Sequence, residues 1–189
     1  MTVEHLRHLR SRLKLTTNHD HAVLWAVSLV GFWGLARRRE MVGPTVKAIT
    51  NRPWDPICIG DVIPRDTRFG LSYSIYVRHP KVNTAHNQYI NLHPRPDDLD
   101  PISALQCILD WHDAQAHDQQ TPLWLLTSME EATPEWLRAL WLAATNFDVG
   151  TSSFRAGGVT RLLYEGVALD TIKMIGRWRS DAFDDYVRS

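Results

Sequence analysis

The chain has only two cysteines, Cys58 and Cys107, among 189 residues. A fold held together by disulfides, or a zinc site built on cysteines, is therefore not expected. The chain also lacks any run of roughly 18 apolar residues, the length that a membrane-spanning helix needs. Its first residues lack the apolar stretch of a secretory signal. These absences favour a globular protein that is neither membrane-inserted nor secreted.

Motifs for metal and nucleotide binding are missing as well. The chain has nine histidines, but none lies in a His-Glu-x-x-His pattern. His112 and His117 are five residues apart in a predicted helix, which does not place them on one face. There is no Gly-rich phosphate loop and no Gly-x-Ser-x-Gly nucleophile turn. The sequence predicts no metal and no small-molecule cofactor.

The chain has no net charge, which argues against a simple nucleic-acid-binding protein, usually a basic one. The charge is nevertheless segregated. Residues 1–54 carry nine Lys or Arg against three acids, and residues 97–135 carry nine acids and no Lys or Arg. A basic face could meet phosphates while an acidic face points away, because fields are screened beyond about 10 Å. The alternative is two solvated faces of a neutral domain.

Hydrophobic periodicity predicts a helix-rich fold. Expected helices cover Val3 to Lys14, Ala22 to Ala36 after a cap at Asn18 or Asp20, Pro101 to His117, and Pro134 to about Asn146 after a cap at Thr133, with a helical last third. The helix at 22–36 is apolar nearly all round and should be buried.

Short strands are expected at 45–50, around 57–62, at 69–77 and at 88–92. The run at 69–77 alternates with the period of two that is typical of a strand. The fold class is therefore mainly α with a small antiparallel β-sheet (α+β). At 189 residues, a single domain over 1–189 is expected.

The most specific motifs lie in the last third. Residues 153–158 read Ser-Phe-Arg-Ala-Gly-Gly, residues 176–178 read Gly-Arg-Trp, and Tyr186 lies near the end. Upstream, residues 37–40 read Arg-Arg-Arg-Glu after an apolar helix. Metal-free cleavage of a phosphodiester needs such an inventory: a nucleophile, forked cations that hold the growing negative charge, an acid and a base.

In their order, these motifs resemble the C-terminal catalytic half of the tyrosine recombinases, phage-integrase-like enzymes that break and rejoin DNA. The likeness is greatest to the variants carried by fungal mobile elements. It spans roughly Val3 to Arg188, with its specific part in the last third. It implies an integrase-like catalytic core in a chain without the N-terminal core-binding domain that completes a clamp around DNA in relatives.

The resemblance implies that Arg37 is the first phosphate-clamping arginine and that Glu40 is a buried residue that orients the site. Arg38 and Arg39 would contact DNA beside them. The alternative for these arginines is a basic turn that complements the dipole of the preceding helix.

Arg155 matches the second arginine position, and Arg179 would contact DNA nearby. Gly157 and Gly158 would let the backbone approach a neighbouring element or DNA closely. The alternative is a tight helix start with an incidental arginine.

Lys81 lies between two expected strands, where the family carries the lysine that protonates the leaving 5′-oxygen. Tyr186 would be the nucleophile that forms a 3′-phosphotyrosyl bond, and this bond stores the energy for rejoining without ATP. Taken alone, Lys81 is an ordinary solvated loop lysine and Tyr186 an ordinary packed aromatic.

Two positions depart from the family or leave its pattern open. Ser152 occupies the place of a histidine, and a serine hydroxyl cannot replace imidazole as a proton acceptor near neutral pH. At the third motif, Arg177 is nine residues before Tyr186, and Trp178 follows it. Either residue fits the position, and Trp178 is equally compatible with a packed core residue.

The resemblance implies DNA cleavage and rejoining in recombination or integration, with double-stranded DNA as the partner and self-association on DNA. It implies a nuclear protein if the source is eukaryotic and a cytoplasmic one otherwise. A second hypothesis is a catalytically impaired DNA-binding relic of a mobile element, marked by Ser152. A third is an unrelated helical interaction domain.

Overall fold

The computed structural model describes residues 1–43, 55–78, 89–150 and 152–178. Over these ranges the protein is a mixed α+β structure with seven α-helices and a three-stranded antiparallel sheet, which confirms the expected class. The elements are α1 (Val3–Arg12), α2 (His19–Trp33), α3 (Arg38–Met41), a 3₁₀ turn (Ile59–Asp61), β1 (Val62–Thr67), β2 (Gly70–Tyr76), β3 (Tyr89–Leu92), α4 (Pro101–Ala114), α5 (Pro134–Thr145), α6 (Ser153–Tyr164) and α7 (Leu169–Ile175).

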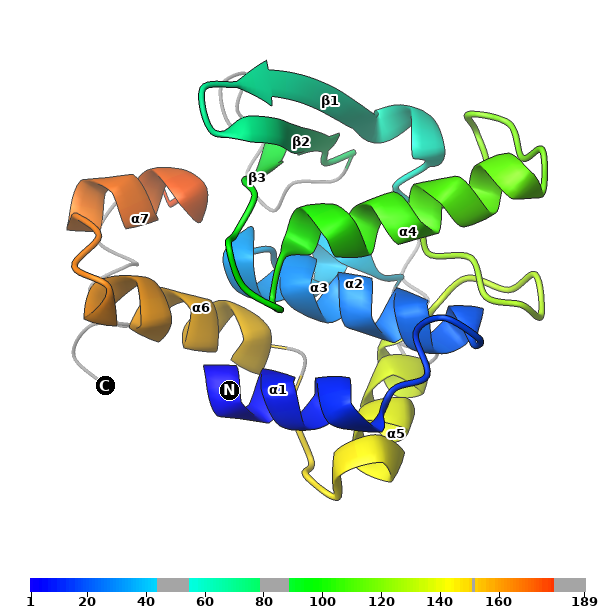
Figure 1. Ribbon diagram of the computed structural model, residues 1–189, viewed down its shortest axis with the longest axis horizontal. Coiled ribbons are helices and arrows are strands. Elements are labelled where there is room, and N and C mark those ends of the chain that lie inside the picture. The colour runs from blue at the N-terminus through cyan, green and yellow to red at the C-terminus, as the bar shows by residue number, and fades with distance from the viewer. Residues whose placement is uncertain (44–54, 79–88, 151, 179–189) are drawn as a thin grey trace.

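Helix α2 is the centre of the molecule. Every residue from Ala22 to Trp33 is buried, as the nearly uniform apolar sequence predicts. It packs against α4, α6, α5 and β3. In Figure 1 the sheet lies above α2, and helices α1 and α5 lie below α2. Helices α6 and α7 lie on the left, whereas α4 extends to the right. Each of these elements buries its apolar side against α2 or a neighbour of α2.

The sheet has the spatial order β1-β2-β3, with each strand antiparallel to its neighbour. The paired residues Tyr73 and Leu92, and Ile75 and Ile90, are buried and face the core. Because β2 and β3 are antiparallel neighbours, residues 77–88 connect their adjacent ends. The predicted Lys81 belongs to this connection and lies outside the described residues.

Local capping sets several helix ends where the sequence predicts them. The Asn18 side chain accepts a hydrogen bond from the His21 backbone at the start of α2, 3.1 Å away. Thr133 caps α5 through the Trp136 backbone, 3.1 Å away. At the end of α5, Asn146 takes a left-handed conformation with φ 59°.

The sequence-based strand at 57–62 is wrong. Residues 59–61 form a 3₁₀ turn, and β1 begins only at Val62 and runs to Thr67. Pro64 and the charged residues after it hide this strand from the hydrophobic pattern. Proline is tolerated there because β1 lies at an edge of the sheet. The strand expected at 45–50 lies outside the described residues.

Helix α1 ends at Arg12 rather than Lys14, and two further helices also end earlier than expected. Helix α2 stops at Trp33 rather than Ala36, because Gly34 forms the C-cap and Leu35 then turns to a positive φ of 46°. Helix α4 stops at Ala114 rather than His117, and Ala116 has a φ of 54°. In α2 and α4 a left-handed residue directly follows the C-cap, and the hydrophobic pattern does not reveal such a residue.

Helix α6 crosses α2 at very short range. A Cβ atom on Gly158 would lie 1.9 Å from the Phe32 carbonyl oxygen, and one on Gly157 would lie 2.3 Å from the Met1 carbonyl oxygen. No side chain fits at either position. This confirms that the glycine pair permits a close approach to neighbouring elements, and it places Arg155 beside the end of α2.

Candidate functional site

Arg155 is buried against the C-terminal end of α2. Its residue exposure is 4%. Its Nη1 donates to the Leu35 carbonyl oxygen, 2.8 Å away and 120 residues earlier in the chain, and its Nη2 donates to the Gly176 carbonyl oxygen at 2.7 Å. The indole of Trp178 covers the guanidinium, 3.8 Å from ring centroid to Cζ. Arg155 therefore joins the start of α6 to the end of α2 and to the turn after α7.

Arg177 is buried nearby, with 8% of its surface exposed. Its Nη2 forms an ion pair with Glu40 Oε2 at 2.6 Å. Its Nη1 donates to the Gly34 carbonyl oxygen at 3.2 Å and to the Ile175 carbonyl oxygen at 3.1 Å. The residue itself has a positive φ of 58°. Arg177 thus faces inward, while Trp178 packs on Arg155.

Glu40 joins two arginines. It is 3% exposed, and its Oε1 accepts from Arg37 Nη1 at 2.7 Å. Its other oxygen accepts from the Arg37 backbone N–H at 2.7 Å, which closes the first turn of α3, as well as from Arg177. Glu40 is buried as expected, and it links α3 to the turn after α7.

These contacts make one continuous polar cluster, which we call the arginine cluster: Arg37, Glu40, Arg155, Arg177 and Trp178. It is held around the carbonyl groups of Gly34 and Leu35, at and just beyond the end of α2. The Leu35 carbonyl oxygen lies at its middle, since it accepts from Arg155 and, at 3.3 Å, from Arg177. The last carbonyls of a helix have no partner within the helix, and the helix dipole makes them attractive to cations. Gly34 is the C-cap of α2, so Arg177 caps the helix directly through the Gly34 carbonyl oxygen, whereas Arg155 binds the carbonyl of Leu35, just beyond the helix.

Burial and charge act in opposite directions on Glu40. Burial raises the pKa of its carboxyl group, but the Arg177 guanidinium and the bonds from Arg37 lower it more, so the pKa lies below its ordinary value. Glu40 is therefore ionised at neutral pH, and it fixes both arginines. Among the three arginines of this cluster, Arg37 is the one that reaches solvent, with 27% of its side chain exposed against 4% for Arg177, and Trp178 is half-buried.

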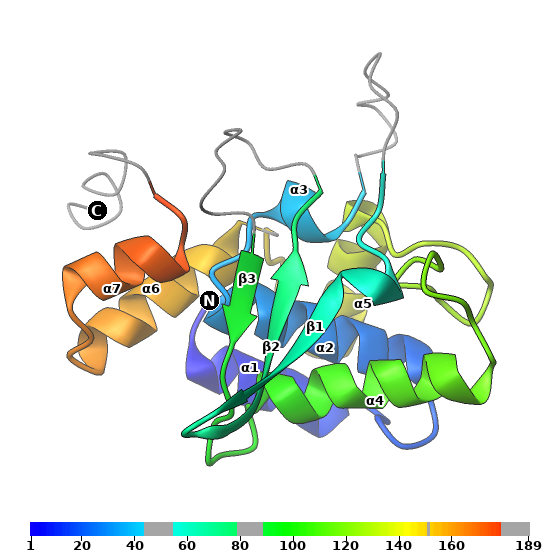
Figure 2. The same ribbon diagram turned by 90° about the horizontal axis from the view of Figure 1, so that it is seen from above.

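The remaining predicted residues lie around or outside the cluster. Ser152 is exposed at the start of α6, and its side chain makes no capping bond. Arg38 is half-buried and Arg39 is exposed, both on α3. Lys81, Arg179 and Tyr186 lie outside the described residues. Figure 2 shows α3, the adjoining ends of β2 and β3 and the end of α7 toward the same edge of the molecule.

The arrangement can bind an anion more readily than it can activate a nucleophile. Arg37 offers a partly exposed guanidinium whose orientation is fixed by a buried carboxylate, which suits a phosphate oxygen. To bind a phosphate, Arg155 would have to release its backbone carbonyl partners, or use N–H groups that do not donate to them. The Ser152 hydroxyl is placed in solvent but is not a base.

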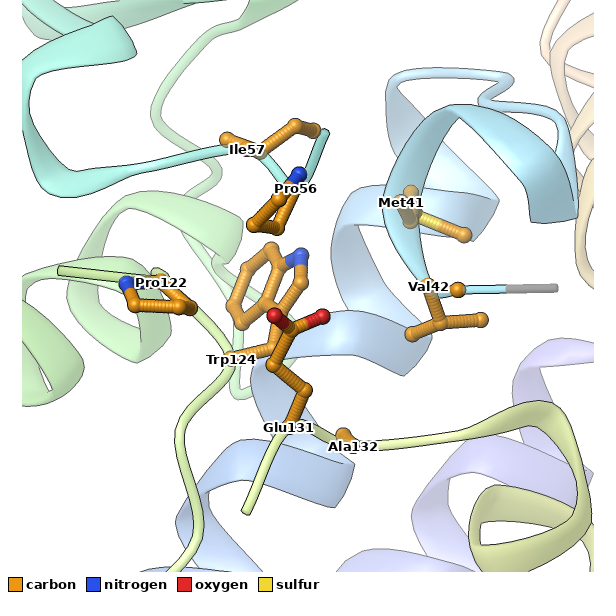
Figure 3. Close-up of a pocket in the computed structure, with 9 residues that line it drawn as sticks. Met41, Val42, Pro56, Ile57, Pro122, Trp124, Glu131 and Ala132 are labelled. Atoms are coloured by element: carbon orange, nitrogen blue, oxygen red, sulfur yellow. The ribbon is translucent and has the colours of Figure 1, made fainter. Parts of the chain in front are cut away.

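A separate hollow lies at the C-terminal end of α3, where Met41 and Val42 line it. It contains about 180 Å³ of space, part of it open to solvent, and its walls are largely apolar. Figure 3 shows Trp124 at its centre, between Pro56, Pro122 and Met41, with the Glu131 side chain beside the ring. Trp124 Nε1 is buried there and finds no hydrogen-bond partner among the described residues. None of the cluster residues lines this hollow.

Over the described ranges, no group of three or more His, Cys, Asp or Glu side chains could hold a metal ion. None of the helices described is long and apolar enough to cross a membrane. His112 and His117 do meet, with their Nδ1 atoms 2.9 Å apart, because His117 lies beyond the end of α4 and folds back. The sequence pattern treated both as helical and missed this pair.

The inward role of Arg177 was also missed. The available signal was a second arginine beside Trp178 together with a glutamate expected to be buried, since a buried carboxylate needs a cation. Models of known protein families and curated protein sequences were compared with the chain, and none of them matches it.

Proposed function

We propose that the chain is a tyrosine-recombinase-like catalytic domain with an integrase-like fold, which binds double-stranded DNA and cleaves and rejoins it through a 3′-phosphotyrosyl intermediate. One observation carries the proposal: the fold brings Arg37, Arg155 and Trp178 into one cluster. The bond from Arg155 to Leu35 spans 120 residues of sequence. These three residues were selected from sequence motifs alone.

The proposed reaction assigns each step to a residue. The Tyr186 oxygen attacks the phosphorus, the bond to the 5′-oxygen breaks, and Lys81 gives a proton to that leaving oxygen. Arg37 and Arg155 hold the negative charge that grows on the non-bridging oxygens. A tyrosine hydroxyl has an ordinary pKa of about 10, so its proton needs an acceptor. In the proposal this acceptor is water, because Ser152 cannot serve. Self-association on DNA pairs two such sites for rejoining.

A second candidate is favoured by the burial of Arg155. Both of its terminal nitrogens donate to backbone carbonyl groups, and its residue exposure is 4%. An arginine that in this way joins the backbone after α2 to the turn after α7 contributes to the fold without touching DNA. With Ser152 in place of a histidine, this arrangement fits a DNA-binding relic that no longer cleaves.

A nicked suicide duplex, which traps the covalent intermediate, distinguishes the two candidates. The recombinase proposal expects a covalent protein–DNA band that disappears in Tyr186→Phe and that forms faster in Ser152→His. Loss of one charge-stabilising arginine, as in Arg155→Ala, should slow the reaction by roughly 100- to 1,000-fold. Tyr164→Phe is the matched control, because Tyr164 is an exposed tyrosine on α6 with 83% of its surface accessible.

If the protein is a DNA-binding relic, we expect no covalent band. We expect instead a salt-dependent gel shift that is weaker in Arg37→Ala. Absence of DNA binding even at low salt would contradict both candidates and favour an unrelated helical interaction domain. A covalent band that survives Tyr186→Phe would show that the nucleophile is a different residue.

A further inference from the structure

The third motif contains a residue whose role the resemblance does not provide. We infer that Arg177 is a positioning residue: through its ion pair with Glu40 it holds Arg37 in the orientation that binds a DNA phosphate. The inference rests on the proposed DNA-binding function. It also separates the two candidates for the third motif, with Arg177 acting inside the protein and Trp178 at the surface of Arg155.

Arg177 has no donor to offer to DNA. Its side chain is 4% exposed. Both terminal nitrogens are occupied by three carbonyl oxygens and by Glu40. Its Nε is buried and lacks a partner within the described part of the chain. Any effect of Arg177 on DNA must therefore pass through the groups that it touches.

The arrangement is a poor way to gain stability. Arg177 adopts a left-handed backbone conformation with φ 58°, which costs free energy for a residue other than glycine. Its orphan Nε adds a desolvation cost. Buried ion pairs are often no better for stability than well-packed apolar residues of similar volume. Such features persist where an orientation matters, and the group oriented here is Glu40.

Glu40 transmits the effect because one carboxylate serves both arginines. Oε2 accepts from Arg177 at 2.6 Å, and Oε1 accepts from Arg37 at 2.7 Å. The Arg177 charge is the largest of the influences that lower the Glu40 pKa against burial. Without that charge, burial is opposed only by the bonds and charge of Arg37, and the pKa of Glu40 rises. Below the new pKa the carboxyl group is neutral, and Arg37 loses its ion pair.

The test measures the affinity of the full chain for a fluorescently labelled duplex as a function of salt and pH. Arg177→Gln should weaken binding by about tenfold, comparable to the loss of one charged hydrogen bond. It should also lower the salt slope by about one, the signature of a lost phosphate contact. The double variant Arg37→Ala/Arg177→Gln should bind no more weakly than Arg37→Ala, since both act through one contact.

The pH profile separates positioning from a purely structural role. In Arg177→Gln the affinity should fall with acidification at a higher pH than in the wild type, because Glu40 is protonated at a higher pH. Arg177→Lys keeps the charge, so it should restore most of the wild-type pH profile while recovering only part of the affinity. Arg138→Gln is the matched control: Arg138 is an exposed arginine on α5, paired with Asp148, and its loss should leave the pH profile unchanged.

A folded variant without the ion pair provides an independent check. Replacing both charges, as in Glu40→Leu/Arg177→Met, should preserve folding, as judged by circular dichroism and tryptophan fluorescence. It should still show the reduced affinity and the reduced salt slope. If Arg177→Gln fails to fold, this double variant decides the question.

Three results would overturn the inference and leave the proposed function intact. They are wild-type affinity and salt slope in folded Arg177→Gln, losses that add to those of Arg37→Ala, and wild-type binding by the folded apolar pair. Absence of salt-dependent DNA binding by the wild-type chain would instead overturn the proposed function itself.

Discussion

Arginine side chains that look alike in the sequence have different surroundings in the fold. Arg37 keeps 27% of its side chain exposed, whereas the Arg177 side chain keeps 4%. Arg177 binds the carbonyl group of Gly34, which α2 leaves unpaired at its C-cap, and Arg155 binds the carbonyl group of Leu35, just after the helix. A guanidinium has five donors in a rigid fork, so one side chain can cap a helix and still carry an ion pair. The two buried arginines are therefore part of the fold whether or not they serve DNA.

His112 has a defined protonation state because of its neighbours. It is 1% exposed, and its Nε2 lies 3.0 Å from the Leu123 carbonyl oxygen. A carbonyl only accepts, so Nε2 carries the proton and Nδ1 accepts from His117 Nδ1 at 2.9 Å. His19 stacks on Trp111 close by, with ring centroids 3.6 Å apart. Burial lowers the pKa of both His112 and His19. The hydrogen bonds to carbonyl oxygens raise the pKa, but by less than burial lowers it.

These depressed pKa values predict loss of stability on mild acidification. The unfolded chain, with an ordinary histidine pKa of about 6.5, binds protons before the folded chain does. The free energy of unfolding should therefore have its full value above about pH 6.5 and should decrease as the pH falls toward the pKa values of the folded state. Urea unfolding at a series of pH values between about 7.5 and 5 measures this, in a range where carboxylates stay largely ionised.

The matched comparison is His112→Gln against His8→Gln. The glutamine side chain of the first variant cannot titrate, so the acid dependence should flatten, although stability at neutral pH is lower. His8 lies on α1, where its ring meets Phe147 edge-on at 5.9 Å, and its replacement should leave the acid dependence in place. An unchanged pH dependence in folded His112→Gln would show that the acid sensitivity has another origin.

At the scale of elements, the contact between α2 and α6 positions the arginine cluster. The Phe32 carbonyl occupies the space where a side chain at position 158 would begin. Arg155 lies one turn earlier on α6 and reaches the end of α2 directly. The separation of the two helices therefore determines whether Arg155 can reach the Leu35 carbonyl oxygen.

Gly158→Ala should destabilise the protein by about 3 kcal/mol, the upper part of the range for overpacking, since the clash is with backbone rather than a flexible side chain. The measurement is the free energy of unfolding in urea. Gly150→Ala is the control, because a Cβ there would come no closer than 3.7 Å to Ser153 Oγ. Equal stabilities of the two variants would contradict the close packing of α2 on α6.

At the scale of the whole molecule, the core is continuous. Buried side chains from α1, α2, the sheet, α4, α5, α6 and α7 form one cluster. The arginine cluster adds ties between distant parts of the chain, such as the ion pair that joins Glu40 to Arg177 across 137 residues. A continuous core of this kind is expected to unfold as a unit.

We therefore predict a single cooperative transition. Urea unfolding followed by far-ultraviolet circular dichroism should coincide with unfolding followed by tryptophan fluorescence. The probes are well distributed: buried tryptophans lie in α2, in the segment after α4 and in α5, namely Trp25, Trp33, Trp124 and Trp141. Two separated transitions would contradict the single domain expected over residues 1–189.

The sequence by itself determined the elements that depend on near neighbours. The apolar run of α2, the caps at Asn18 and Thr133, and the alternation at 69–77 act within a few residues, so their patterns are visible in one dimension. β1 was missed because an edge strand with a proline needs no apolar pattern. The ends of α2 and α4 were missed because they depend on left-handed residues.

Only the tertiary structure decided which groups the motif residues contact and how far they are buried. The sequence selected Arg37, Glu40, Arg155 and Trp178 and kept Arg177 as an alternative, but it could not tell an exposed guanidinium from a buried one. Burial depends on what packs alongside, and here that is a carbonyl group 120 or 142 residues away. The charge of an arginine is a property of the residue, whereas its availability to a phosphate is a property of the fold.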